Sequence, residues 1–496
     1  METQSKEMLG TGNVGEYRMD APIEFKGLAS DSREVKPGYL FAALPGTRAD
    51  GGRFIADAVA KGAVAVLGRP ELASQAREFA IAFLADENPR LRLAHLAAGF
   101  FGAQPSTVAA VTGTNGKTSV AVFLRQIWAS EGLCAASLGT IGLVTPTGEI
   151  ALAHTTPDPI ALHRLLAELK RDGIDHLALE ASSHGLDQYR LDGVRIAAAA
   201  FTNITRDHLD YHPTFEDYLN AKLRLLSELV CEGGVAVVNA DARYADRFSA
   251  AALARKLQLL TVGNSGNDLR LISQKPRGDG QDLRVVYRST EREIALPLAG
   301  SFQASNALVA AGLALGLGEP EDKVFAAVSQ LHGAPGRLEK VAYAPSGAPV
   351  YVDYAHTPDA LKTVLTALHP HVSGQLHVIF GCGGDRDKGK RPLMGAAAAK
   401  HADVAIVTDD NPRSEDPAVI RRETLAGCAG AREIGDRAEA IHAGIAALHS
   451  GDVLVIAGKG HESGQVIGSV TRPFSDRAEA IKAAVALGGR AAESPA

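Results

Sequence analysis

The chain has 496 residues, of which 46% are hydrophobic and 22% charged, fractions typical of a globular protein rather than a disordered, collagen-like or coiled-coil one. At roughly 150 residues per domain, this length predicts about three domains. Asp and Glu number 57 and Lys and Arg 51, so the net charge is −6. This balance lacks the strongly basic character of a nucleic-acid-binding domain, and we expect no nucleic-acid partner.

The cysteine pattern and the N-terminus predict a cytoplasmic location. The four cysteines lie far apart and form no CxxC pair, which indicates a reducing compartment and argues against a structural zinc site. The first twenty residues are charged and lack the apolar core of a signal peptide. No apolar run approaches the roughly 20 residues of a membrane span, so we expect no membrane insertion. We also expect a monomer.

Short β-rich runs alternate with Ala- and Leu-rich helical patterns along the whole chain, which predicts an α/β fold. Two internal breaks divide it, FGAQPS at 101–106 and GAPGR at 333–337. They predict an N-terminal domain over 1–105, a central domain over 106–335 and a C-terminal domain over 336–496.

Polar clusters follow seven strand-like runs. The runs are Val108–Val111, Leu177–Leu179, Ala198–Phe201, Val350–Val352, Val378–Phe380, Ala405–Val407 and Leu454–Ile456. In open parallel sheets, ligands bind beyond the carboxyl ends of the strands. Three clusters belong to the central region and four to the C-terminal region, so we expect a site between two α/β domains.

A glycine-rich loop follows the first of these runs and opens a helix. Its residues are Gly113, Thr114, Asn115, Gly116, Lys117, Thr118 and Ser119. Such a loop lets backbone amides surround phosphates, while the lysine bridges the outer phosphates and the following Thr can bind magnesium. Val111 stands where the strict pattern has Gly, and a chance GKT in a turn is the alternative. The strand before and the helix after favour nucleotide binding.

Lys222 stands on the apolar face of a predicted helix. Thr214 and Asp217 have the spacing of a capping box, and Phe215, Tyr218, Leu219, Leu226 and Leu229 share one face with Lys222. Arg224 is expected on the opposite, outward face. A lysine on a core face is costly unless its charge is neutralised, paired or used. The alternative is that the side chain extends to the surface.

Glu180 and His208 each follow a strand-like run. Together with Thr118 they offer oxygen and nitrogen ligands near the glycine-rich loop, which fits one or two magnesium ions. A purely structural role for each residue is the alternative.

Two charged turns lie in the C-terminal region. Arg386, Lys388, Lys390 and Arg391 crowd one glycine-rich turn, and Asp410, Asn411, Pro412 and Arg413 form the second. Because Arg binds carboxylates in bidentate fashion, the two turns indicate an anionic substrate. A solvated run of charges is the alternative.

The motifs together resemble those of the Mur ligases, the ATP-dependent amide-forming enzymes of peptidoglycan synthesis. They run in order over nearly the whole chain: GTNGKTS (113–119), EASSHGLDQYR (180–190), TNITRDHLDYH (202–212), the Lys222 helix, SFQASNA (301–307), DYAHTPDAL (353–361), GGDRDKGKRPLMG (383–395), DDNPR (409–413) and AGKGHE (457–462). They are most similar to members that join 2,6-diaminopimelate to the D-glutamate γ-carboxylate of UDP-N-acetylmuramoyl-L-alanyl-D-glutamate.

The resemblance implies a UDP-binding N-terminal domain, a central P-loop ATPase-like domain with a mostly parallel sheet, and a Rossmann-like C-terminal domain. It implies that ATP and its phosphates are bound by the glycine-rich loop and by Asn306, Arg337, Asp353 and His356. Lys222 resembles the lysine that these enzymes carbamylate. A carbamate there would be an anion able to bind magnesium beside Thr118, Glu180 and His208.

The resemblance also implies two substrate pockets. For the UDP-muramoyl dipeptide the matching residues are Ser30, Ser32, Thr47, Arg48, Ala49, His154, Thr155, Thr156, Ser182, Gln188 and Arg190, with His154 in a position where the family has Asn. For meso-diaminopimelate they are Arg386, Asp410, Asn411, Pro412, Arg413, Gly458 and Glu462.

The choice of amino acid depends on Arg413. Diaminopimelate ends in a second carboxylate where lysine has only an ammonium, so Arg413 and Arg386 favour diaminopimelate. An unpaired Arg facing the ammonium of lysine would disfavour that substrate. A lysine-adding homologue, a P-loop phosphotransferase and a nucleotide-binding protein without activity are the alternatives.

Overall fold

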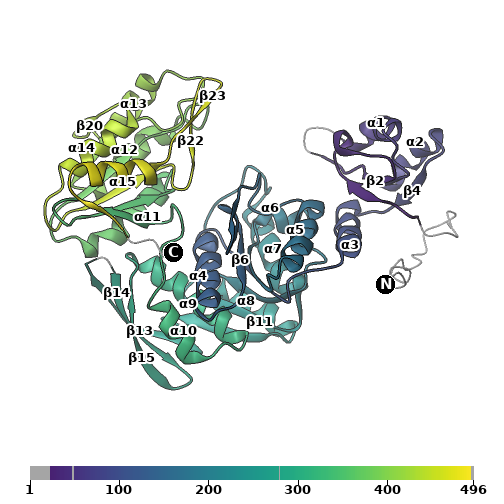
Figure 1. Cartoon of the computed structure of the whole chain (residues 1–496), viewed down its shortest axis with the longest axis horizontal. Coiled ribbons are helices and arrows are strands. Elements are labelled where there is room, and N and C mark those ends of the chain that lie inside the picture. Colours follow the sequence, from purple (N-terminus) through teal and green to yellow (C-terminus); the bar gives the residue numbers. More distant parts are fainter. Residues whose placement is uncertain (1–22, 47–49, 279, 493–496) are drawn as a thin grey trace.

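The computed structural model describes residues 23–46, 50–278 and 280–492. Figure 1 shows three α/β parts along the long axis of the molecule, with the central part between the N-terminal and C-terminal ones. Helix α3 (Pro89–Phe101) leads from the N-terminal part into the central one.

The N-terminal part is a four-stranded parallel sheet in the order β1-β2-β3-β4. Its elements are β1 Gly27–Ala29, β2 Tyr39–Ala42, α1 Ile55–Ala60, β3 Ala65–Gly68, α2 Ala73–Glu78 and β4 Ala82–Ala85. Two apolar clusters, one on each face, form its core, with Leu40 and Leu93 in one and Phe41 and Ile55 in the other.

The central part contains an eleven-stranded sheet in the order β15-β14-β13-β12-β11-β10-β5-β9-β6-β7-β8. The strands from β13 to β6 are parallel, and the two ends of the sheet are antiparallel. The strands are β5 Thr107–Thr112, β6 Ala135–Gly139, β7 Gly142–Thr145, β8 Gly148–Ile150, β9 His176–Glu180, β10 Ile196–Phe201, β11 Val230–Asn239, β12 Gln258–Gly263, β13 Leu269–Arg277, β14 Gly280–Tyr287 and β15 Thr290–Leu296.

Helices cover both faces of this sheet. Helices α4, α9 and α10 pack on one face, where Trp128 and Phe123 are buried. Helices α5, α7 and α8 pack on the other, where Tyr218 and Phe248 are buried. The helices are α4 Lys117–Ser130, α5 Pro159–Arg171, α6 Ser183–Asp187, α7 Phe215–Arg224, α8 Ala245–Ala254, α9 Ser301–Gly316 and α10 Glu321–Val328. Coverage of both faces explains why the central strands β5, β9 and β10 are almost continuously apolar.

The C-terminal part has a seven-stranded sheet in the order β20-β19-β18-β21-β17-β16-β24, parallel from β20 to β17. Its elements are β16 Glu339–Tyr343, β17 Pro349–Asp353, α11 Pro358–Leu368, β18 Leu376–Phe380, α12 Lys390–His401, β19 Val404–Val407, α13 Pro417–Leu425, β20 Arg432–Glu433, α14 Arg437–Ala446, β21 Val453–Ala457, α15 Asp476–Ala486 and β24 Arg490–Ala491. A hairpin of β22 (Gly464–Ile467) and β23 (Val470–Pro473) stands apart.

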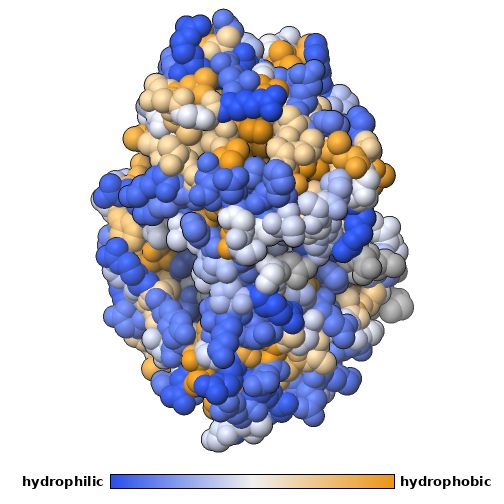
Figure 2. Space-filling view, turned by 90° about the vertical axis from the view of Figure 1, so that its left-hand side faces the viewer, coloured by the Kyte–Doolittle hydropathy of each residue, from blue (hydrophilic) through white to orange (hydrophobic). Residues whose placement is uncertain are grey.

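The predicted α/β fold is confirmed, and each of the seven strand-like runs lies within a strand (β5, β9, β10, β17, β18, β19 and β21). Within the described ranges, no helix is both long and apolar enough to cross a membrane. Figure 2 shows a mainly hydrophilic face with hydrophobic residues in small groups.

Helix α7 begins at the predicted capping box and ends before Leu226 and Leu229, which were expected on its apolar face. Thr214 and Asp217 form the capping box, and the α-helix ends at Arg224 before a π-helical turn over Leu225–Leu229. The expectation that Arg224 faces outward is wrong. Its side chain is only 12% exposed and pairs with Asp192 at 2.5 Å, because the chain before β10 brings a carboxylate against this face.

Candidate active site

The glycine-rich loop connects β5 to the N-terminus of α4. Gly113 and Gly116 have φ values of 151° and 88°, in the region that favours glycine. A Cβ on Gly116 would collide with the Asn306 side chain of α9. Lys117 Nζ donates to the carbonyls of Gly113 and Thr114, each at 2.9 Å, and burial lowers its pKa. The loop therefore holds its lysine close to its own backbone.

The segment after β10 supports this loop. Asn115 N donates to Asn203 Oδ1 at 3.0 Å, and Thr202 Oγ1 donates to Asn115 O at 2.6 Å. Thr114 Oγ1 also lies 2.8 Å from the hydroxyl of Tyr218 on α7. The loop is thus held from β10 and α7 as well as by its own helix.

Lys222 lies in the core beside this loop. It is 1% exposed, so the alternative in which it extends to the surface is wrong. Its Nζ donates to Gly113 O at 2.8 Å and lies 4.7 Å from the centre of the Tyr218 ring. Burial, together with the nearby Lys117, lowers the pKa of Lys222 well below its usual value. A lysine with a lowered pKa is available as a neutral amine.

Glu180 is the last residue of β9, whereas His208 lies in the loop after β10, seven residues beyond the last residue of that strand. Glu180 is buried and accepts hydrogen bonds from the backbone N–H (2.8 Å) and hydroxyl (3.1 Å) of Thr140. His208 has a left-handed φ of 54°, and its ring packs 4.9 Å from that of His184. Burial lowers the pKa of His208, and Lys117 and Lys222 act in the same direction, which favours the neutral ring that binds metals.

Three or more His, Cys, Asp or Glu side chains do not gather into a metal site anywhere in the described ranges. The predicted magnesium ligands include only two such residues, Glu180 and His208. The others are Thr118, which is buried at the start of α4, and Lys222, which would need its carbamate to bind a cation. The magnesium site stays a prediction.

The residues predicted to bind the muramoyl dipeptide form a hydrogen-bonded network beside Glu180. Thr156 Oγ1 donates to Glu180 O at 2.9 Å and lies 3.0 Å from Ser182 Oγ. Arg190 donates to Thr156 O at 2.7 Å and to Gln188 Oε1 at 2.8 Å. Thr155 Oγ1 lies 3.1 Å from Thr140 Oγ1.

The other residues predicted to bind this substrate do not belong to that hydrogen-bonded network. The side chain of His154 is exposed. Ser32 is buried and its carbonyl accepts from Lys61, whereas Ser30 is exposed. Thr47, Arg48 and Ala49 lie outside the described residues.

The ATP-binding residues predicted outside the glycine-rich loop lie on α9 and in the first segments of the C-terminal part. Asn306 Nδ2 donates to Gln303 Oε1 at 3.4 Å, and Gln303 Nε2 donates to Arg337 O at 2.8 Å. Arg337 stacks on Tyr354, with the guanidinium carbon 4.5 Å from the ring centre. Because Asn306 also lies against Gly116, these contacts connect the glycine-rich loop through α9 to Arg337.

Asp353 is the last residue of β17, and His356 follows three residues later. The Asp353 carboxylate accepts from the backbone N–H groups of Leu338 (2.6 Å) and Ala355 (2.8 Å). Burial raises its pKa to about 6. The ring of His356 is exposed and packs 4.6 Å from that of Tyr354.

The residues predicted to bind the amino acid gather at the carboxyl ends of β18, β19 and β21. Arg413, with a left-handed φ of 51°, donates to Gly384 O at 2.9 Å. Asn411 Nδ2 donates to Glu462 Oε2 at 3.0 Å. A Cβ on Gly458 would lie 2.7 Å from Asp410 Oδ2, and one on Gly383 would lie near both Arg413 and Arg386. The carbonyl oxygen of Pro412 lies so close to Gly384 that a Cβ on this glycine would collide with it.

The basic turn after β18 is only partly available to a substrate. Arg391 is fully buried and pairs with Glu423 at 2.6 Å and Glu415 at 2.8 Å. Lys388 also pairs with Glu415, at 3.2 Å. The prediction that this whole turn serves an anionic substrate is therefore wrong for Arg391, whose partners come from α13 and the segment before it, whereas the side chain of Lys388 is 66% exposed. Arg386 is exposed.

Sequence reasoning missed residues that hold these clusters in place. Thr140 orients Glu180, and Arg437 is buried between the two loops after β19 and β21. Lys459 is buried within the AGKGHE motif. Arg437 pairs with Asp476, which lies 39 residues further along the chain, so no local pattern in the sequence indicates the pair.

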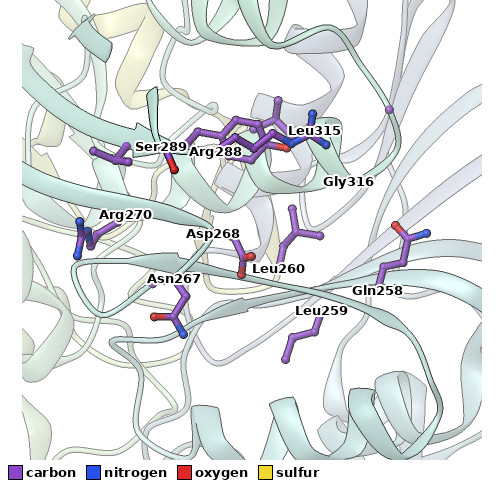
Figure 3. Close-up of a pocket in the computed structure, with 14 residues that line it drawn as sticks. Gln258, Leu259, Leu260, Asn267, Asp268, Arg270, Arg288, Ser289, Leu315 and Gly316 are labelled. Atoms are coloured by element: carbon purple, nitrogen blue, oxygen red, sulfur yellow. The ribbon is translucent and has the colours of Figure 1, made fainter. Parts of the chain in front are cut away.

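A pocket of about 740 Å³ lies elsewhere on the central part. Figure 3 shows it between the start of β12, the turn near Asp268, the β14–β15 turn and the end of α9. The start of β12 lies at the opposite end of the parallel strands from the glycine-rich loop. No predicted site residue lines this pocket, and Asp268 already accepts from the backbone and hydroxyl of Thr261.

The fold defines a three-domain α/β protein with a P-loop-type central sheet. Three family models match in chain order: the catalytic domain of the Mur ligase family over 24–101, the Mur ligase middle domain over 111–314, and the Mur ligase glutamate ligase domain over 336–460. A relative from Bradyrhizobium diazoefficiens is 55% identical over 472 residues, covering 94% of this chain and 96% of the relative. The chain belongs to the Mur ligase family.

That relative is a UDP-N-acetylmuramoyl-L-alanyl-D-glutamate–2,6-diaminopimelate ligase. A solved structure of a ligase of the same name is 36% identical, with a TM-score of 0.72, and covers 95% of this chain and 97% of its own. A MurF ligase from Thermotoga maritima, solved in complex with ADP, is 19% identical with a TM-score of 0.57 over 93% of this chain and 96% of its own. This last likeness concerns the fold alone.

Proposed function

We propose that this protein is an ATP-dependent ligase that joins meso-2,6-diaminopimelate to the γ-carboxylate of D-glutamate in UDP-N-acetylmuramoyl-L-alanyl-D-glutamate, in peptidoglycan synthesis. The observation that carries the proposal is the presence of two clusters on one chain: the glycine-rich loop with Lys117, and the cluster of Arg413, Asn411 and Glu462. The relative from Bradyrhizobium diazoefficiens supports the choice of substrates.

The reaction has two steps, and its atoms balance without a covalent enzyme intermediate. A γ-carboxylate oxygen of D-glutamate attacks the γ-phosphorus of ATP, and ADP leaves with the pair of electrons from the broken P–O bond. The neutral amine of diaminopimelate then attacks the acyl carbon, loses a proton, and phosphate leaves as the amide forms. Catalysis consists of positioning and charge neutralisation, because both reactants are anions.

Lys117 and the loop amides would neutralise the phosphates in this scheme. Thr118, Glu180, His208 and a carbamate on Lys222 would hold magnesium, which supplies further positive charge at the phosphates. The lowered pKa of Lys222 supports the carbamate, since only a neutral amine adds carbon dioxide.

Arg413 and Arg386 would receive the distant carboxylate of diaminopimelate, and Asp410 and Glu462 its ammonium groups. Lysine carries no carboxylate at that end, and its ammonium would face Arg413 without compensation. The alternative of a lysine-adding homologue therefore fits this cluster less well.

The remaining assignments are part of the same proposal. The segments 1–105, 106–335 and 336–496 would bind the UDP end, ATP and the amino acid respectively. The four cysteines are unpaired, which supports action in the reducing cytoplasm. We propose a monomer without membrane or nucleic-acid partners.

Phosphate release distinguishes this ligase from a phosphotransferase. The protein with ATP, magnesium and the UDP-muramoyl dipeptide should release phosphate continuously only when diaminopimelate is added, because the amine must consume the acyl phosphate. Omitting the dipeptide is the control and should stop release. Steady release that is independent of the amino acid would contradict the ligase and support a phosphotransferase or a hydrolase.

A further inference from the structure

The ammonium of Lys459 is buried within the amino-acid cluster. Lys459 follows β21, and its side chain is 0% exposed. Its Nζ donates to Glu462 Oε2 and to Asn411 Oδ1, both at 3.0 Å. A buried ammonium is costly unless it is paired and hydrogen-bonded, and these two partners provide the compensation.

Lys459 determines how its two partners are oriented. Asn411 Oδ1 accepts from Lys459 and from the backbone N–H of Val466 at 2.9 Å. The amide of Asn411 therefore directs its Nδ2 toward Glu462 Oε2. Glu462 Oε2 thus accepts from two donors, while Glu462 Oε1 has no hydrogen-bond partner within the described part of the chain. One carboxylate oxygen is held and the other is available.

Other hydrogen bonds already join the loop after β19 to the segment around β22. Arg413 N donates to Val466 O at 3.0 Å, and Gly468 N donates to Arg413 O at 2.7 Å. Gln465 Nε2 donates to Asp410 O at 2.7 Å. A hydrophobic side chain in the place of Lys459 would fill the space without the desolvation cost of a charge, so the bonds between loops do not explain the lysine.

We propose that Lys459 is a positioning residue of the amino-acid pocket: it fixes Glu462 and Asn411 so that Glu462 presents one oxygen to an ammonium group of the incoming diamino acid. This inference rests on the function proposed above. Lys459 acts through Glu462 and does not itself contact the substrate.

The variant Lys459→Met keeps the length of the side chain and removes its charge. We expect its KM for diaminopimelate to rise about 10-fold or more, which corresponds to about 1.4 kcal/mol. The KM values for ATP and the UDP-muramoyl dipeptide should change less than about 2-fold. Acyl-phosphate formation, trapped with hydroxylamine in the absence of diaminopimelate, should remain at the wild-type level. This trapping tests the proposed function separately, because it does not use the amino-acid pocket.

A double mutant separates positioning from folding. Glu462→Ala alone leaves the Lys459 ammonium buried without its carboxylate and should lower the melting temperature. The double variant, with Lys459→Met added to Glu462→Ala, should recover part of the lost melting temperature. Its KM for diaminopimelate should equal that of Glu462→Ala alone. The matched control is Lys482→Met, since Lys482 and Glu479 form a pair with the same i,i+3 spacing at the surface, and no kinetic parameter should change.

Three outcomes would overturn the inference. The first is an unchanged KM for diaminopimelate in Lys459→Met, and the second is an equal rise in the KM of all three substrates. The third is a full further rise in the KM for diaminopimelate when Lys459→Met is added to Glu462→Ala. Wild-type protein that traps no acyl phosphate would instead contradict the proposed function itself.

Discussion

Replacing Lys117 with Ala should abolish acyl-phosphate formation. Lys117 is the ammonium that the glycine-rich loop holds beside its own carbonyls, and in the proposed reaction it neutralises charge that develops on the transferred phosphoryl group. Loss of one such group costs about 10²–10³-fold in rate, and we expect at least that loss in hydroxylamine-trapped product.

The control is Lys170→Ala, which removes a partly exposed lysine paired with Asp175 in the same domain. This variant should keep wild-type activity. Measured nucleotide binding and an unchanged melting temperature would show that Lys117→Ala is folded. A Lys117→Ala protein that forms acyl phosphate at the wild-type rate would exclude the assigned role of the loop.

Replacing Asp476 with Ala should destabilise the C-terminal part more than any surface change. Arg437 and Asp476 are both 0% exposed and form a bidentate pair with distances of 2.6 and 2.7 Å. Arg437 also donates to Ala457 O at 3.0 Å and to Asp409 O at 3.4 Å, so it connects the ends of β21 and β19. Removing one partner of a buried pair typically costs about 3–5 kcal/mol.

Thermal unfolding measures this effect. The control Asp282→Ala removes the partner of Arg277 in an exposed pair and should cost less than about 1 kcal/mol. Replacing the pair together, as Arg437→Met with Asp476→Leu, should recover much of the lost stability because no unpaired charge stays buried. An Asp476→Ala protein with the melting temperature of the wild type would show that the pair contributes little to the free energy of unfolding.

The strand positions were predictable from sequence because local patterns determine them. Runs such as Val108–Val111 and Leu454–Ile456 are apolar throughout, as expected for strands covered on both faces, and the polar motifs after them are adjacent in the chain. The capping box at Thr214 is equally local and was found. The apolar helix face that carries Lys222 was found in the same way, but its burial was not, because a lysine on such a face can also extend to the surface.

Interactions between distant segments were not predictable in the same way. Arg391 was predicted to serve a substrate and Arg224 to face outward, yet their partners Glu423 and Asp192 come from other elements. The π-helical turn after Arg224 buries Leu225 and Leu226 in a core that it shares with β11 and α8. Lys459 stood inside a quoted motif, but its role depends on Asn411, which lies 48 residues earlier in the chain.

The most direct test of the account is the mass of the product formed in a competition. The protein is incubated with the UDP-muramoyl dipeptide, ATP, magnesium and equal concentrations of meso-diaminopimelate and L-lysine. The account predicts that the product carries diaminopimelate almost exclusively, because Arg413 and Arg386 pair with a carboxylate that lysine lacks. A product that carries mainly lysine would contradict it.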